Sequence, residues 1–564
     1  MVASRAGCFV LVALACLTAS VVSGCSPSHY KAQADRDVYG AIDRQWQDEC
    51  GPREGYHVPD VDPSVHQLAP ARAYPAPGVV TLAEALVLAL DHNRLFQMEK
   101  ELLYLTGLNE TLIAYQFAPH PLGSVTGFVR RDRVTGVPDR TDAGAEAALF
   151  YQQVFSTGAT ITADLLSSWT QVLSGERSGG FATLGNVAFV QPLLRGLGSD
   201  IVLEPWRQAQ RDTLYQVRTF NRARQVLAAQ VMAEYYQVLE LEAVVRHAQA
   251  NYEAMTAHVK RMDDLAKAGR VTDYEILEAR QDRTDAHNEL LEARQEYETL
   301  LDLFKQTIGI PITTDIRLDA DELNAHWSLD LLNLEQPEAG AIELALARRL
   351  DLANQRDRID DADRHIKVTA DALGPGLSIV ATGGLATSSR DNNFGASGVD
   401  DTFTLGLRFD APLDRLLERN AYRTALLELV QRRREYEDGV QLASMEVRQA
   451  LRDLLTAAER RRILEEQLAP AIERLRSAES LLQYGRADAR DVLDAQQDLF
   501  DLQVEIADTR TDYAVAAVNL YRDTGVLDVQ KNGQCDALQR RSPAPHDAGD
   551  PAGGDGAGDG DLPG

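Results

Sequence analysis

Apolar residues follow a helical spacing over two long stretches of the chain, residues 199–267 and 414–483. In the first stretch Val231, Tyr235 and Val238 are separated by four and three positions, which is the repeat of a coiled-coil seam. Arg, Glu and Gln occupy much of the remaining surface. At ~1.5 Å per residue, each helix would be on the order of 100 Å long. We therefore expect two helices far longer than those of an ordinary globular domain.

A second pattern, with apolar residues at every other position, stands ahead of each long helix. Phe403, Leu405, Leu407 and Phe409 share one face of the segment 403–410, and mostly polar residues occupy the other face. The length of this segment approaches the roughly 9–11 residues of a membrane-spanning strand. Weaker patterns of the same kind predict further strands over residues 377–381, 125–131 and 181–191.

The first half of the chain carries an additional apolar segment, residues 149–170, with a turn at Thr157-Gly158. The offset between corresponding positions of the two halves is 256 ahead of the strands, but it is 220 where Pro192 corresponds to Pro412. The first half therefore has about 36 more residues in its strand region. The sequence leaves open whether these residues enlarge an external loop or form a separate hairpin.

Two similar motifs mark where the long helices end. Residues 269–282 and 485–498 agree at six positions and keep an acidic charge at a seventh, with an offset of 216 residues. Gly309 corresponds to Gly525 at the same offset. In each motif a glycine ends one helix and an acidic, apolar-periodic segment opens the next, so each predicts the tip of a helical hairpin.

The two halves also begin alike, with amphipathic helices expected over residues 79–117 and 338–371. Thr81 followed by Glu84 has the spacing of a capping box. Return helices are expected over residues 271–308 and 487–524. The order of helix, strands and long helical hairpin thus occurs twice. We predict a mainly α protein made of two tandem repeats, with a β part formed by the strands.

The N-terminus has the features of a processing signal. Arg5 precedes the apolar or small residues 8–22, a run too short for a confident spanning helix. The following Val22-Ser23-Gly24-Cys25 resembles the bacterial lipobox. This would make Cys25 the mature N-terminus, acylated at its sulfur and amine, and several acyl chains anchor far better than one. Ser26 follows, where an aspartate would resemble an inner-membrane retention signal. A plain cleaved secretory signal is the alternative.

Composition and candidate chemistry narrow the possible functions. With 57 Lys and Arg against 85 Asp and Glu, the formal net charge is −28, which argues against binding nucleic acid through phosphates. The acids could line a cation-attracting passage or simply solvate the surface. The eleven histidines are scattered, so we predict neither an enzyme nor a cofactor or metal site. Cys50 and Cys535 could form a disulfide in an oxidising compartment, but the sequence does not show that they meet.

The twofold unit behind a lipobox resembles the TolC-type outer membrane efflux protein family, especially its lipoprotein members. The hairpin-tip motifs, the Pro-Leu junctions at 192–193 and 412–413, and the opening helices carry the resemblance. It implies a trimeric α/β-barrel channel, in which each chain gives four strands to a twelve-strand membrane β-barrel and its helices to a periplasmic tunnel. Elementary physics agrees, because four strands cannot close a barrel and lipid does not tolerate open sheet edges.

This resemblance also suggests how the chain is divided. The expected segments are a signal peptide (1–24), a lipid-anchored N-terminal extension (25–78), a first efflux-protein repeat (79–310), a linker (311–336), a second repeat (337–527) and a disordered acidic Gly/Pro-rich tail (528–564).

The resemblance assigns the hairpin tips to the contact with a periplasmic adaptor protein. The tip residues are Gly269 and Arg270 in the first repeat and Gly485 and Arg486 in the second. The family often has a small or apolar residue after the tip glycine, so the two arginines leave the choice of adaptor open.

Acidic residues just after the tips would constrict the channel entrance. By position these are Glu275, Asp491 and Asp494, of which Asp491 and Asp494 lie three positions apart and can share one helix face. Arg270 and Arg486 could pair with some of these acids and hold the helices shut. The alternative is that the acids are solvated residues at helix starts, where negative charge favours the helix dipole.

The implied function is the outer membrane channel of a tripartite efflux or export system. It would pass small molecules from a periplasmic adaptor and an inner membrane pump to the exterior, and it would lie lipid-anchored in the outer membrane. The channel of a type I protein secretion system is one alternative. A lipid-anchored coiled-coil scaffold without a pore is another, but it would not need the alternation over 403–409. The exported substrate is not specified by the sequence.

Overall fold

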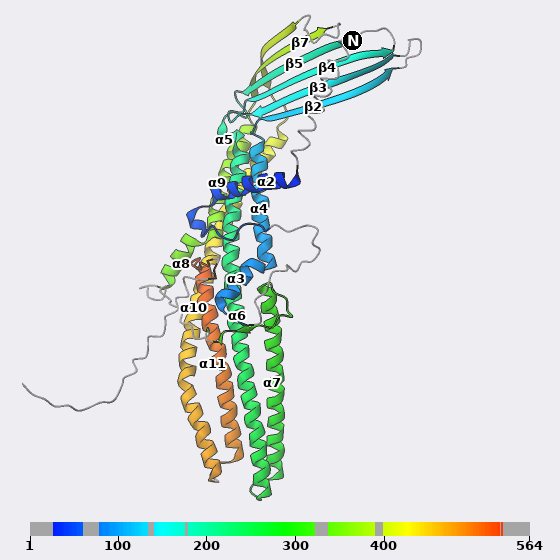
Figure 1. Ribbon diagram of the computed structural model, residues 1–564. Coiled ribbons are helices and arrows are strands. Elements are labelled where there is room, and N and C mark those ends of the chain that lie inside the picture. Colours follow the sequence, from blue (N-terminus) through cyan, green and yellow to red (C-terminus); the bar gives the residue numbers. More distant parts are fainter. Residues whose placement is uncertain are drawn as a thin grey trace, which may run out of the picture.

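The computed structural model describes residues 26–59, 78–132, 140–174, 179–320, 322, 337–389, 399–484, 486–530 and 532–533. The molecule is elongated, with a curved sheet at one end, long helices running away from it, and two helical hairpin tips at the other end (Figure 1). In these described ranges no helix combines the length and the apolar character needed to cross a membrane.

Both repeats have the predicted order of elements. The first contains α3 (Leu82–His92), α4 (Arg94–Tyr115), four strands, the short α5 (Ser199–Val202), α6 (Glu204–Lys267) and α7 (Asp273–Thr307). The second contains α8 (Pro337–Arg348), α9 (Leu350–Ala372), two strands, α10 (Leu416–Gln483) and α11 (Ala489–Asp523). The long helices and their return helices are confirmed. Each opening helix is broken in two, at Asn93 and at Arg349, where extended backbone stops one helix before the next begins.

The breaks in the opening helices face the ends of the return helices. Gly309 and Gly525, which follow α7 and α11, have φ values of +78° and +72°. A Cβ on Gly309 would lie 2.4 Å from the His92 backbone, and one on Gly525 would lie 3.2 Å from the Arg348 backbone. Both the left-handed backbone and the close approach require glycine. Gly309 and Gly525, which the equal offset identified in the sequence, therefore each allow the end of a return helix to approach the break in an opening helix.

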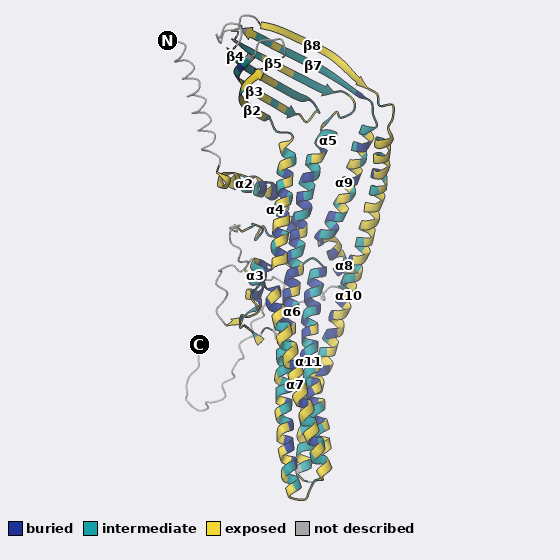
Figure 2. Cartoon of the chain, turned by 90° about the vertical axis from the view of Figure 1, so that its right-hand side faces the viewer, coloured by how far each residue is buried: buried dark blue, intermediate teal, exposed yellow. Residues whose placement is uncertain are grey.

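The core lies at mid-height, where α6 is enclosed by its neighbours. Val231, Tyr235 and Val238 of the predicted seam are all fully buried, and Tyr235 packs edge-on against Phe304 of α7. The Tyr235 hydroxyl donates a 2.9 Å hydrogen bond to the carbonyl of Val80. Burial is concentrated on the inner faces of the helices, and exposed positions dominate elsewhere (Figure 2).

The N-terminal segment packs against the middle of the helical body. This segment forms the helix α2 (Pro27–Gln45), which contacts α4 and α6. A single 3-10 turn, η1 (Asp48–Cys50), follows it. Cys50 is a buried free thiol whose pKa is raised by burial. Cys535 lies outside the described residues, so a disulfide between Cys50 and Cys535 stays a hypothesis.

The strands form one antiparallel sheet in the order β2-β3-β4-β5-β7-β8. Their bounds are β2 (His120–Asp132), β3 (Arg140–Val154), β4 (Thr160–Ser174), β5 (Gly179–Pro192), β7 (Gly376–Ser389) and β8 (Val399–Asp410). The expectation of four strands per chain is wrong, because six strands are present. The additional segment 149–170 is a hairpin within the sheet, formed by β3 and β4 around the predicted turn at Thr157-Gly158. A separate parallel pair, β1 (Val79–Val80) and β6 (Arg317–Leu318), joins the start of the first repeat to the segment after α7.

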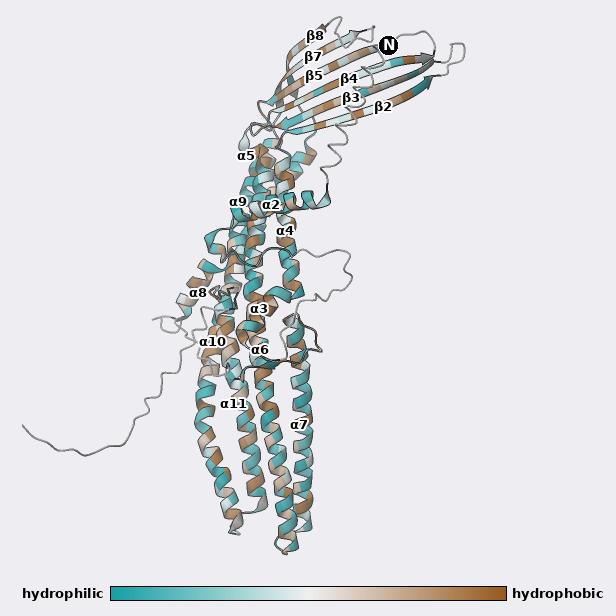
Figure 3. Ribbon diagram, in the orientation of Figure 1, coloured by the Kyte–Doolittle hydropathy of each residue, from teal (hydrophilic) through white to brown (hydrophobic). Residues whose placement is uncertain are grey.

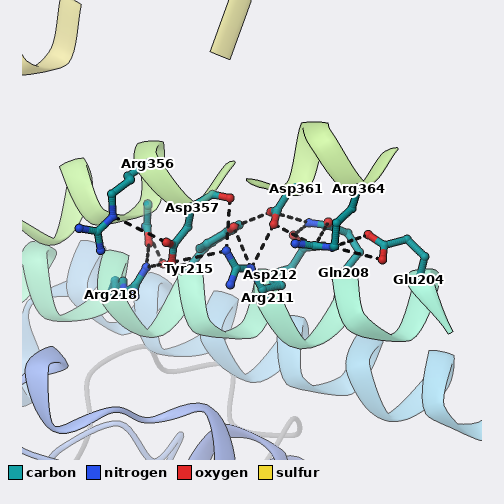
Figure 4. A network of polar contacts seen from close by, with 11 residues as sticks. Glu204, Gln208, Arg211, Asp212, Tyr215, Arg218, Arg356, Asp357, Asp361 and Arg364 are labelled. Carbon is teal, nitrogen blue, oxygen red and sulfur yellow. Dashed lines mark hydrogen bonds and ion pairs between the residues drawn. The ribbon is translucent and has the colours of Figure 1, made fainter. Parts of the chain in front are cut away.

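A chain of ionic contacts joins the two repeats just below the sheet (Figure 4). Asp361 of α9 accepts from Arg211 at 3.1 Å, from Arg364 at 2.9 Å and from the hydroxyl of Tyr215. Asp357, one turn away on α9, pairs with Arg218 at 2.7 Å. The side chains of both aspartates are at least 86% buried. The network fixes α6 of the first repeat against α9 of the second.

Candidate functional site at the hairpin tips

The first tip is a tight reversal between α6 and α7. Gly269 has a φ of +69°, and the amide of Arg270 donates a 3.0 Å hydrogen bond to the carbonyl of Leu265. This is how a glycine in the left-handed region ends a helix. The second tip follows the same plan, because the amide of Arg486 donates to the carbonyl of Leu481 at 2.9 Å. Gly485 lies outside the described residues.

Two of the three predicted entrance acids serve as helix caps. The Glu275 carboxylate accepts the Thr272 amide at 2.6 Å, and the Glu275 amide donates to the Thr272 hydroxyl. In the second tip Asp491 and Asp488 form the matching capping box. The hydrogen bonds from the Thr272 amide and hydroxyl lower the pKa of Glu275. Both carboxylates therefore stabilise helix starts whatever else they do.

The third predicted acid, Asp494, lines a groove between the two hairpins. The groove has a volume of about 280 Å³ and runs between α6, α7 and α11. Half of the residues that line it are acids, and these are Glu278, Asp282, Asp285, Glu289 and Asp494. Four of them lie on α7 and were not predicted. Their separations of four, three and four positions place them on one helix face. This spacing could have been recognised in the sequence.

Neighbouring carboxylates in this groove raise one another's pKa. Burial and then the neighbouring Glu278 and Asp285 raise the pKa of Asp282. Burial and then Asp501 and Asp285 raise the pKa of Glu289. Crowded carboxylates of this kind favour cations nearby. Within the described ranges, however, no three His, Cys, Asp or Glu side chains converge closely enough to hold a metal ion.

Two arginines bridge the hairpins near the tips. Arg490 of α11 pairs with Glu278 of α7 at 3.9 Å, and Arg261 of α6 pairs with Glu479 of α10 at 3.6 Å. The arginines proposed for this task from the sequence, Arg270 and Arg486, form no ion pair with the entrance acids in the described part of the chain. Their amides are engaged in the two reversals. Pairing of their side chains with entrance acids across three chains stays a prediction.

An apolar contact accompanies these bridges. Met262 is fully buried with Val259 and Ala279 in a small cluster that joins α6 to α7, and Leu482 of α10 packs against it from the other hairpin. The two tips are thus held side by side by weak ion pairs around a small apolar contact.

The second repeat identifies the protein. Residues 341–526 match the outer membrane efflux protein family. The second repeat of this chain therefore belongs to that family. The match covers α8 to α11 with the strands between them. The efflux protein is therefore a channel protein of the bacterial outer membrane whose helices extend into the periplasm, and it is not an enzyme.

Solved structures share the fold along most of the efflux protein. The CmeC outer membrane channel of Campylobacter jejuni is 16% identical, with a TM-score of 0.57, covering 85% of this chain and 94% of that chain. The open state of the MtrE outer membrane channel of Neisseria gonorrhoeae is 15% identical, with a TM-score of 0.58, covering 79% and 89%. A membrane protein from Pseudomonas aeruginosa is 18% identical, with a TM-score of 0.58, covering 79% and 93%. No curated protein sequence matches the chain.

Proposed function

We propose that the protein is the outer membrane channel of a tripartite efflux system and works as a homotrimer. The sheet end would lie in the outer membrane, and the hairpin tips would meet a periplasmic adaptor that is served by an inner membrane pump. Small molecules would enter between the tips and leave through the sheet end.

The outer face of β8 carries this proposal. Phe403, Leu405, Leu407 and Phe409 are between 64% and 75% exposed in the single chain. Four large apolar side chains in a row are not left in water without cost, and a lipid environment removes that cost. A coiled-coil scaffold without a pore would have no use for this surface.

The tip residues would then form the entrance. Gly269, Arg270 and Arg486 lie in the reversals at the far end of the molecule from the sheet (Figure 1). Together with Gly485, which lies outside the described residues, they would contact the adaptor. Glu275, Asp491 and Asp494, together with the α7 acids of the groove, would surround the opening with negative charge. The entrance would therefore attract cationic solutes.

The trimer and the pore can be tested together. We expect the purified protein in detergent to have a mass close to that of three chains and to give discrete conductance steps in a planar bilayer. A monomer that keeps its strand content, or a trimer without conductance, would contradict the proposal. If the conducting protein prefers a polypeptide to small molecules as its cargo, the second candidate function, a protein secretion channel, would be favoured.

A lipid anchor at Cys25 is proposed from the lipobox and lies outside the described residues. We expect mass spectrometry of the N-terminal peptide to find Cys25 as the first residue, acylated at its sulfur and amine. Cys25→Ser should abolish incorporation of labelled fatty acid, whereas Cys50→Ser, the matched control, should retain it. An unmodified Cys25 or an intact signal peptide would rule the anchor out.

A further inference from the structure

The β3–β4 hairpin has no counterpart in the second repeat. There, β7 follows the opening helix α9 and β8 leads directly into the long helix α10. In the first repeat β2 follows α4 and β5 leads into α5 and α6, so these two strands correspond to β7 and β8. The hairpin is therefore an insertion between the two strands that each repeat requires.

The inserted strands are full members of the sheet. β3 pairs with β2 over thirteen residues, from His120↔Gln152 to Asp132↔Arg140, and β4 pairs with β5 over twelve. The turn between them is tied to the helical body, because the Gly198 amide donates to the Thr157 carbonyl. A Cβ on Gly158 would lie 2.4 Å from the carbonyl of Gly196. The inserted hairpin is thus an integral part of the sheet and is not a loose loop.

One face of the whole sheet is apolar, and the inserted strands continue it. Following the register from strand to strand, the residues on the side of Phe403 and Leu405 include Leu385, Ala381, Phe189, Val187, Leu165, Ile161, Trp169, Leu149, Ala147, Ala145, Val125 and Val129. The opposite side is mixed: it carries the polar residues Ser124, Thr126, Arg130, Glu146, Asp164, Asn186, Thr382, Thr404 and Arg408, and also the apolar residues Leu122, Phe128, Phe150, Leu166 and Leu184. Alternating bands of the two kinds are visible along the strands (Figure 3). All six strands therefore have the pattern of a membrane wall with lipid on one side and water on the other.

The sheet does not close on itself in one chain. β2 and β8 are its two edges, each paired on one side only. Lipid does not tolerate the unpaired backbone groups of an open edge. A second copy of the chain can satisfy them, because β2 runs away from the helices and β8 runs back toward them, so the two edges meet antiparallel.

We propose that three copies of the six-stranded sheet close an eighteen-strand barrel, joined at each subunit boundary by β2 of one copy and β8 of the next. This proposal rests on the proposed homotrimer. The diameter of a barrel grows roughly linearly with strand number, so eighteen strands in place of twelve make it about half as wide again and roughly double its cross-section.

The wider barrel has a consequence for selection. The described chain connects the sheet to the helical body at four junctions only, through α4, through α5 leading into α6, through α9 and through α10 (Figure 1). The helical passage is therefore not widened together with the membrane wall. The barrel section admits bulkier solutes than the entrance, and the upper size limit for cargo is set at the helical end.

The register across the subunit boundary can be deduced. β2 begins at His120 and β8 ends at Asp410, both at the end of the sheet that adjoins the helices. Six residues up from these ends lie Thr126 and Thr404, which are exposed and belong to the same mixed face of the sheet. With the helix-side ends of the two strands aligned, Thr126 of one copy is opposite Thr404 of the next.

Cysteine cross-linking tests this boundary. In the full chain with Cys535→Ser, Thr126→Cys together with Thr404→Cys should form disulfides that give covalent dimers and trimers on a denaturing gel, because paired positions bring Cβ atoms within ~4–5 Å. Each single variant should remain monomeric on the gel. Thr126→Cys with Leu405→Cys is the matched control, because these side chains point to opposite faces. Absence of cross-linking in a trimer that conducts would overturn the barrel but not the proposed function.

Barrel width has its own test. Deleting residues 140–174 leaves β2 connected to the oppositely directed β5 and removes the inserted hairpin. We expect the intact trimer to admit larger polyethylene glycols from the sheet side than the deletion variant does, with the polymer's effect on conductance as the measure. An equal size limit in two conducting trimers would overturn the wider barrel. If the deletion variant does not assemble, the cross-linking result decides alone. If the unaltered protein is also monomeric, the proposed homotrimer itself is wrong.

Discussion

Replacing both bridging arginines at the tips, Arg261→Ala with Arg490→Ala, is expected to raise the open fraction of the channel on the order of 100-fold. Each exposed ion pair contributes only about 0.5 kcal/mol. Two such pairs in each of three chains sum to ~3 kcal/mol, and every 1.4 kcal/mol changes a ratio about tenfold. Arg490 also lies among the acids of the groove, so its loss adds repulsion between α7 and α11.

Single-channel recording measures this effect as a longer open time or a higher mean conductance. Arg476→Ala is the matched control, because Arg476 pairs with Glu473 on its own helix at 2.9 Å and forms no ion pair with another helix of the described chain. High salt should reproduce part of the effect in the unaltered protein, because exposed pairs are screened. An open fraction that matches the control would show that these bridges do not hold the tips together.

Asp361→Ala is expected to destabilise the helical body by about 2 kcal/mol, the order of the cost of leaving a buried polar group without its partner. The cost is not larger, because Arg211 and Arg364 keep Asp357 and Glu204 as partners. The Asp361 side chain is 11% exposed, and its loss leaves Arg211 and Arg364, at 28% and 23% exposure, without their shared carboxylate. The Tyr215 hydroxyl loses its acceptor as well. Because the network joins α6 to α9, the two repeats should separate more easily beneath the sheet.

Thermal unfolding of the purified protein, followed by its helical circular dichroism signal, measures this loss. Asp363→Ala is the control two residues away on the same helix. Asp363 is 56% exposed and pairs with Lys367 at 2.9 Å, so its removal should cost about 0.5 kcal/mol or less. Equal unfolding temperatures for the two variants would mean that the network adds no net stability.

The periodicity of the sequence determined the long helices, the hairpin reversals and the strands. Helical spacing through Val231, Tyr235 and Val238, and alternation through Phe403 and Phe409, are local properties that a single element satisfies alone. The equal offset of Gly309 and Gly525 indicated the repeat, because both positions need a backbone that only glycine adopts easily. For the candidate site, the sequence located the tips and placed Asp494 beside the entrance.

Contacts between distant segments were decided only by the tertiary structure. Alternation in 149–170 could not show whether this segment extends the sheet, since pairing depends on which strands lie beside it. The acids of α7 line a groove only because α11 packs opposite them in the folded chain. Arg490 and Arg261 were found to bridge the hairpins only in the folded chain, because a side chain's partner depends on its direction in space. No sequence pattern distinguishes Asp361. Its carboxylate is buried and joins the two repeats only because α9 packs on α6.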